Sequence, residues 1–156
     1  MVDLAIGRLR EEKPDFEIFT ASIWTDPGAA SSSIGFESKE NSDKLTQESN
    51  EWSKKYYDQY MAEGDLEQAK LFEPTGTRNN NPADFALTNF VEIDNATIPD
   101  NWEETSDGKC WDDLEPALKE AGAYAFEQMQ TLKLHDQFEL SVNGRQDWYE
   151  FVWRNE

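Results

Sequence analysis

The segment 16–38 constrains the fold more than any other part of the sequence. From Phe16 to Thr25, successive side chains alternate between two faces, which is the period of a β-strand. Asp26-Pro27-Gly28 supplies turn residues, and a second alternating run ends at Ser38, so the segment predicts a hairpin. Both faces of the first strand carry bulky side chains, which predicts a central strand. Because a lone hairpin is only marginally stable in water, other segments must cover or extend it.

Periodicity and breaker residues predict the remaining elements. The predicted helices cover 4–12 before Pro14, the stretch from Asn41 or Ser42 to Gly64, 66–72 with Asp65 as its cap, and 114–132. The predicted strands cover 85–93, 138–142 and 148–153. An Asn143-Gly144 type I′ turn joins the last two strands. These elements predict an α+β fold, with one mostly antiparallel sheet of about five strands packed with about four helices. We expect a single domain over 1–156.

Three details of these elements are open to test. The stripe Trp52, Tyr56 and Tyr60 recurs at helical spacing, which favours a structural core role over a ligand platform. Asn89 lies on the apolar side of its strand and needs a partner or marks an irregularity. Asp112 and Asp113 are expected as cap and first-turn anions of the next helix, with Pro116 in its first turn.

Charge limits the classes of partner. The chain has 33 acidic and 14 basic residues, for a formal net charge of -19. Such a surface repels nucleic acid and anionic lipid, so we expect neither as a partner, whereas it attracts and orients cationic proteins. An acidic surface is also typical of a halophile proteome, and this interpretation stays open.

The single cysteine, Cys110, excludes an internal disulfide and a thiolate-cluster metal site. No apolar run has the length of a signal peptide core or a transmembrane helix, and the calcium-loop and P-loop patterns do not occur. We therefore expect a cytoplasmic protein without cofactor or metal.

Acidity concentrates in the segment 92–115, where Lys109 is the only basic residue. Gathering carboxylates costs self-repulsion, which a cationic partner would relieve, and tryptophans within the segment could serve as interface anchors. The candidate partner-binding residues are Asp94, Asp100, Trp102, Glu103, Glu104, Asp107, Trp111 and Asp112. The alternative interpretation is a solvated loop that leads into the next helix.

The search for catalytic motifs is mostly negative. No G-x-S-x-G elbow occurs, and nothing in the sequence ties the single histidine, His135, to a serine or to Cys110. We therefore expect no catalytic residues. With 33 acidic residues some carboxylate pair is inevitable, so an acidic hydrolase or a carbohydrate-binding domain that uses exposed tryptophans is the alternative.

The chain resembles bacterial immunity proteins of contact-dependent and polymorphic toxin systems. The resemblance rests on a leading helix, the hairpin from Phe16-Glu17-Ile18-Phe19-Thr20 into Ile34-Gly35-Phe36, a Trp-bearing helix, and the closing strand Asp147-Trp148-Tyr149-Glu150-Phe151. It implies a cytoplasmic, non-enzymatic inhibitor of a secreted toxin. The resemblance implies that the toxin is often a nuclease with a basic groove. We therefore expect the inhibitor to occlude the active site, with its carboxylates where substrate phosphates would lie, and binding at an exosite stays open.

Overall fold

The computed structural model describes residues 1–155. Its elements are α1 (Val2–Glu12), β1 (Ile18–Asp26), β2 (Ser31–Glu37), α2 (Lys39–Glu63), α3 (Leu66–Leu71), the 3-10 helix η1 (Pro82–Asp84), β3 (Leu87–Asp94), α4 (Trp102–Thr105), α5 (Cys110–Met129), β4 (Leu134–Val142) and β5 (Phe151–Arg154). They fall into two compact units, one formed by Met1–Lys39 with Asn80–Glu156 and the other by Glu40–Asn79. Our expectation of one domain stays a prediction.

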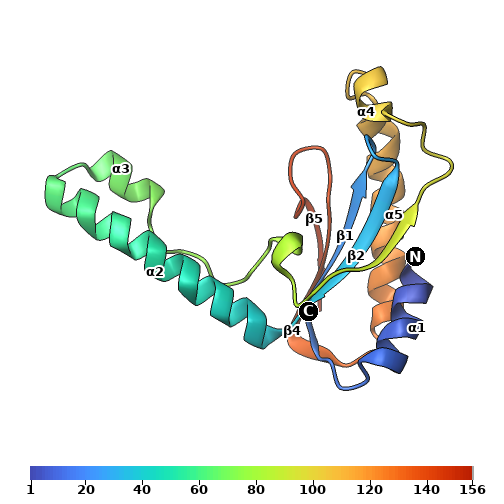
Figure 1. The fold of residues 1–156 in the computed structure, drawn as a ribbon, viewed down its shortest axis with the longest axis horizontal. Helices are drawn as coiled ribbons and strands as arrows, with labels where there is room; N and C mark the ends of the chain where they lie inside the picture. The colour runs from blue at the N-terminus through green and yellow to red at the C-terminus, as the bar shows by residue number, and fades with distance from the viewer. Residues whose placement is uncertain (156) are drawn as a thin grey trace. The chain divides into compact units, whose positions relative to one another are not determined.

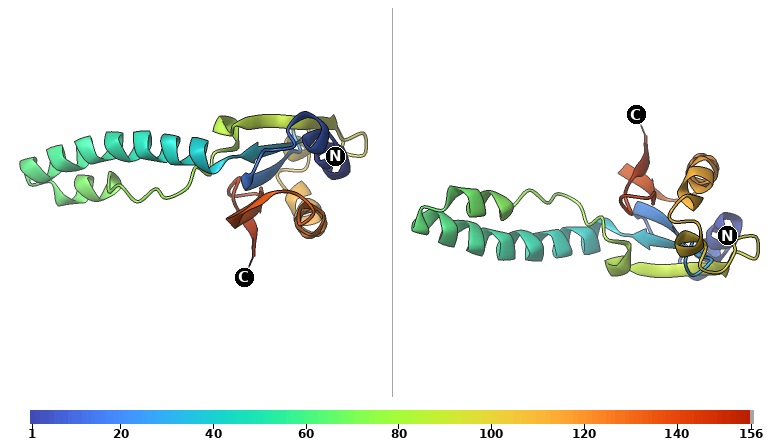
Figure 2. Two further views of the ribbon diagram at one scale, coloured as in Figure 1. Left: turned by 90° about the horizontal axis from the view of Figure 1, so that it is seen from below. Right: turned by 90° about the horizontal axis from the view of Figure 1, so that it is seen from above.

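The first unit contains a single five-stranded sheet in the order β3-β2-β1-β4-β5. The views in Figure 2 show β3 and β5 at opposite edges of this sheet. Strand β1 pairs with β4 in parallel, whereas β1 with β2, β2 with β3 and β4 with β5 are antiparallel. The predicted α+β class is confirmed, with five helices and one mixed sheet that is mostly antiparallel.

The predicted hairpin over 16–38 is confirmed as β1 and β2, and β1 is the middle strand of the five. Ala21 pairs with Phe36 and Ile23 with Ile34, which places these four apolar side chains on one face. All four belong to the hydrophobic core. The alternation of the sequence therefore sets which face of the sheet is buried under helices.

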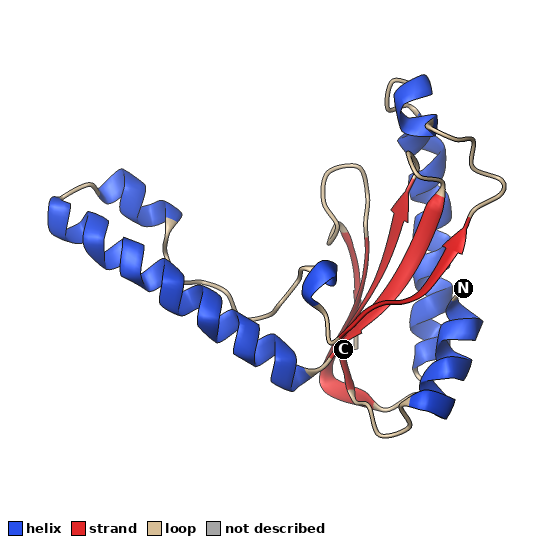
Figure 3. Ribbon diagram, in the orientation of Figure 1, coloured by secondary structure: helices blue, strands red, loops and turns tan. Residues whose placement is uncertain are grey.

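Helices α1 and α5 cover that apolar face, and both lie on the same side of the sheet (Figure 3). Helix α1 buries Ala5, Ile6 and Leu9, a stripe at three- and four-residue spacing. Helix α5 contributes a longer stripe of buried residues: Cys110, Trp111, Leu114, Leu118, Gly122, Ala125 and Met129. The two amphipathic stripes and the sheet close one hydrophobic core.

The predicted start of the long C-terminal helix is wrong in part. Helix α5 begins at Cys110 with Lys109 as its N-cap, so neither aspartate is the cap, and Pro116 lies inside the helix rather than in its first turn. The expectation that Asp112 and Asp113 are first-turn anions is confirmed. The preceding turn, with Gly108 at φ +73, starts the helix earlier than the acidic pair indicated. Asn89 does mark an irregularity, since its φ is 44 and the pairing of β2 with β3 shifts register between Ile34 and Phe36.

The second unit is a pair of helices, α2 and α3. Gly64, at φ +78, follows the end of α2, and the Asp65 carboxylate accepts a hydrogen bond from Gln68 N, so the predicted stop and cap are confirmed. The expectation that the aromatic stripe of α2 is core is wrong in part. Trp52 and Tyr56 pack around the ring of Phe72 from the end of α3, yet Trp52 stays 56% exposed. A two-helix unit has too few elements to bury a stripe that long.

Candidate functional site

A groove with a volume of about 270 Å³ lies at the end of the sheet where β1 stops. Three segments that are distant in sequence line it. They are the end of β1 and its turn (24–27), Glu103 and Trp111 from α4 and α5, and the loop from Asn143 to Trp148. Figure 1 shows the β1–β2 turn beside α4 at this end of the sheet. We call this set of residues the tryptophan groove.

The β1–β2 turn fixes the first wall. Asp26 Oδ1 accepts hydrogen bonds from Gly28 N at 2.7 Å and Ala29 N at 3.0 Å, so the carboxylate holds the turn closed. Trp24 lies two residues before Asp26 and pairs across the strands with Ser33, a side chain too small to cover an indole. Trp24 is therefore 46% exposed although it belongs to the central strand.

Asn143 joins the β4–β5 loop to the end of β1. Its buried amide accepts from Thr25 N at 2.8 Å and donates to Thr25 O at 2.9 Å, which continues the sheet pairing through a side chain. The predicted type I′ turn at Asn143-Gly144 is wrong, because neither residue has the positive φ that such a turn needs. The connection is a longer loop, and the return strand begins at Phe151 rather than at Trp148.

The loop is held together by carboxylates. Glu150 Oε2 accepts from Gln146 N at 2.9 Å and Asp147 N at 3.4 Å, while Asp147 Oδ1 accepts from Tyr149 N at 3.1 Å. These bonds satisfy the backbone without a strand partner. They leave Trp148 52% exposed at the groove. The loop thus presents a large aromatic side chain from a fixed backbone.

The third wall comes from the acidic segment. Trp111 is 5% exposed, and its Nε1 donates to Glu103 Oε1 at 2.8 Å, which fixes this carboxylate at the groove. Arg145, from the opposite loop, lies against Gly108, where a Cβ atom would come within 3.1 Å of its guanidinium. The groove therefore combines exposed indoles with fixed carboxylates from Asp26, Glu103 and Asp147 and a single arginine.

The structure brings only part of the predicted partner-binding set to the groove. Glu103 and Trp111 line it directly. Asp100, Trp102, Glu104, Asp107 and Asp112 lie in or beside α4 and the start of α5, and Asp94 ends β3. Of the two predicted anchors, Trp111 is buried in the core, and Trp102 is partly buried against it. The exposed tryptophans of the groove are Trp24 and Trp148, which the sequence had assigned to strands.

Within residues 1–155, no helix has the length and apolar character needed to cross a membrane. No group of three or more histidine, cysteine, aspartate or glutamate side chains in the described part of the chain could hold a metal ion. No family model matches the sequence, and we found neither a similar curated protein nor a similar solved structure.

Proposed function

We propose that this chain is an immunity-type protein that binds a cationic protein through the tryptophan groove and its acidic surroundings. The partner class we propose is a toxin, most specifically a nuclease whose basic groove this protein occludes in the cytoplasm. The observation that carries the proposal is the combination, in one groove, of two exposed tryptophans with the carboxylates of Asp26, Glu103 and Asp147, in a chain of net charge -19.

Each component suits a basic partner. Tryptophan is enriched among the residues that dominate binding energy, and its ring face attracts a lysine or arginine cation. Fixed carboxylates would accept charge-assisted hydrogen bonds from the same cations, in positions that substrate phosphates would otherwise occupy. The overall negative field would speed encounter with a positive groove.

The direct test uses the product of the neighbouring gene, assayed for cleavage of plasmid DNA. We expect equimolar protein to abolish cleavage. Replacing both Trp24 and Trp148 with alanine should weaken the complex at least about a hundredfold, the loss expected of two hot-spot residues. The control is Trp52→Ala, an exposed tryptophan of the other unit, which should leave inhibition intact.

A second pair of variants tests the charge. Asp100 and Glu104 are exposed, and their carboxylates make no hydrogen bond or ion pair with another side chain among residues 1–155. Asp100→Lys with Glu104→Lys should weaken inhibition strongly, whereas Glu48→Lys with Glu67→Lys, an equal change of charge on α2 and α3, should not. Full cleavage in the presence of excess wild-type protein would refute the proposal. An equal loss of inhibition in both lysine double variants would show that the partner responds to net charge and does not bind this surface.

The groove also favours one other function. The groove holds two exposed tryptophans with neighbouring carboxylates. Tryptophan rings can stack on sugars, and pairs of carboxylates can hydrolyse glycosidic bonds. A carbohydrate-binding or glycosidase role predicts quenching of tryptophan fluorescence by xylo-, cello- or chito-oligosaccharides, lost in Trp148→Ala. Reducing ends released by the purified protein alone would favour the enzyme over the inhibitor.

A further inference from the structure

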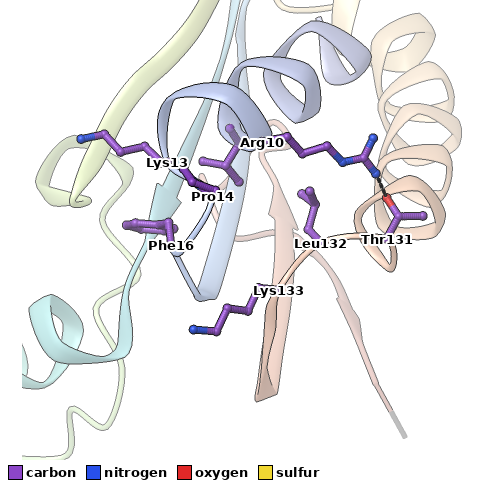
Figure 4. Close-up of a pocket in the computed structure, with 8 residues that line it drawn as sticks. Arg10, Lys13, Pro14, Phe16, Thr131, Leu132 and Lys133 are labelled. Carbon is purple, nitrogen blue, oxygen red and sulfur yellow. Dashed lines mark hydrogen bonds between the residues drawn. The ribbon is translucent and has the colours of Figure 1, made fainter.

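A second pocket, with a volume of about 170 Å³, lies at the opposite end of β1, beside the first residues of that strand. The ends of α1 and α5 meet there. Leu9, Phe16 and Leu132 provide apolar lining, and Arg10, Lys13 and Lys133 provide charge (Figure 4). This pocket shares no residue with the tryptophan groove.

The charge of the pocket is opposite to that of the protein. Three of the 14 basic residues line this one hollow. Within residues 1–155, none of the three forms an ion pair with a carboxylate. Arg10 donates to Thr131 Oγ1 at 2.7 Å, and Lys133 Nζ reaches only the carbonyl of Asp15 at 3.4 Å.

Other cations of the chain do find acidic partners. Arg8 pairs with Glu12 and Arg154 with Glu139, at 2.7 to 2.8 Å. The Glu12 carboxylate, next to Lys13 in sequence, is hydrogen-bonded by Arg8; Lys13 attracts it through space but forms no ion pair with it. With 33 acidic residues available, cations that stay unpaired around one hollow leave local positive charge for a ligand to neutralise.

The geometry divides the cations into two sets. Figure 4 shows Lys13 and Lys133 extending on the same side of the pocket, with the ring of Phe16 between them. Arg10 turns the other way to reach Thr131. Two ammonium groups, each with three donors, can therefore approach one oxyanion above an aromatic surface. The volume of about 170 Å³ is below the roughly 300–1,000 Å³ of pockets for drug-sized ligands, so the ligand is small.

We propose that this pocket binds a small organic anion, in which a short apolar or aromatic body carries one carboxylate or phosphate group. Lys13 and Lys133 hold the anionic group, and Phe16 and Leu132 contact the body. The inference does not depend on the proposed function, because the two sites share no residue and take ligands of opposite charge.

The test is an NMR titration of the full chain with four probes. Benzoate and phenyl phosphate carry both required features, inorganic phosphate lacks the body, and benzamide lacks the charge. We expect saturable shifts at Phe16, Leu132 and Lys133 with benzoate or phenyl phosphate, and affinities at least about tenfold weaker for the other two probes. The tighter of the first two probes identifies the anionic group as carboxylate or phosphate.

Paired variants assign the site. Lys13→Gln with Lys133→Gln should reduce affinity about tenfold, the combined effect of two exposed charge contacts. Lys44→Gln with Lys109→Gln changes net charge equally at exposed positions outside the pocket and should change affinity less than about twofold. Chemical-shift changes that do not saturate or that lie outside the pocket would overturn the proposal. An equal loss of affinity in the two double variants would overturn it as well. The NMR spectrum of each variant shows whether it is folded. The single variant Lys133→Gln repeats the test with a smaller change, and its affinity should fall about threefold.

Discussion

At the scale of single residues, close packing decides what the chain tolerates. The indole of Trp153 on β5 packs against Gly122 of α5, where a Cβ atom would come within 2.9 Å of Trp153 Cζ2 and nearer still to adjacent ring atoms. A rigid ring between strand and helix cannot move aside as a flexible side chain can. Glycine is therefore required here by contact rather than by backbone conformation.

We predict that Gly122→Ala lowers the free energy of unfolding by about 1–3 kcal/mol, the usual cost of overpacking a filled contact. The matched control is Gly7→Ala, in helix α1, where a Cβ atom meets nothing within 4 Å. That variant should gain up to about 1 kcal/mol from helix propensity. Urea unfolding gives the free energy of unfolding of both variants. Equal values for Gly122→Ala and Gly7→Ala would contradict close packing at Gly122.

A second residue-scale prediction concerns Glu12. Its hydrogen bond with Arg8 lowers the pKa of the carboxyl below the usual 4.5. A lowered pKa means that the stabilising contribution is present above the ordinary value and is lost as the pH falls through the folded-state pKa. Arg8→Gln should return the pKa of Glu12 toward 4.5, as measured by carboxyl carbon NMR.

Arg10→Gln serves as the control for this measurement. Arg10 lies on the same helix but donates to Thr131, so its loss should leave the pKa of Glu12 where it is. If Arg8→Gln and Arg10→Gln shifted this pKa equally, the effect would come from general charge and not from the hydrogen bond.

At the scale of elements, the pairing of α2 with α3 depends on one aromatic cluster. Phe72 follows α3 and contacts Trp52, Tyr56 and Tyr60 of α2, with ring centroids 5.4 to 5.7 Å apart. Ala69 is the buried residue of the short helix itself. A helix of this length has little stability of its own, so it depends on this contact.

We predict that Phe72→Ala releases α3 from α2. Hydrogen exchange of amides in Leu66–Leu71 should accelerate at least about tenfold, because each aromatic pair contributes roughly 1 kcal/mol. Exchange in the sheet strands should not change, since they belong to the other compact unit. Leu71→Ala, which removes a side chain that is mostly in solvent, is the control. Unchanged protection of α3 in Phe72→Ala would refute this dependence.

At the scale of the whole molecule, self-repulsion is the dominant electrostatic term. A net charge of -19 on 156 residues opposes compaction, and salt relieves the repulsion as the Debye length falls from about 30 Å at 0.01 M to about 8 Å at 0.15 M. The ion pairs Arg8–Glu12 and Lys54–Asp58 are exposed, so screening them should cost less stability than the relief of repulsion adds.

We therefore predict that Tm rises as sodium chloride is added between these concentrations. Replacing Asp100 and Glu104 with lysine reduces the net negative charge, and this variant should show a shallower rise than the wild type. Differential scanning calorimetry at several salt concentrations gives both slopes. A Tm that falls with salt would mean that attractive pairs outweigh repulsion.

The local elements can be predicted from the sequence, because they depend on neighbouring residues. The hairpin over 16–38, the stop at Gly64, the cap at Asp65 and the irregularity at Asn89 all follow from periodicity and backbone preference. The acidic segment was also visible in the sequence, and Glu103 and Trp111 of that segment line the groove.

Which distant residues meet depends on the tertiary fold and could not be predicted from the sequence. The parallel pairing of β1 with β4 joins positions more than a hundred residues apart, and the buried amide of Asn143 completes it by bonding Thr25 rather than forming a tight turn. The same pairing brings Trp24 and Trp148 to one groove, while packing buries Trp111 of the acidic segment and partly buries Trp102. Whether an indole is covered depends on the side chains across the sheet and above it, and local periodicity carries no information about those neighbours.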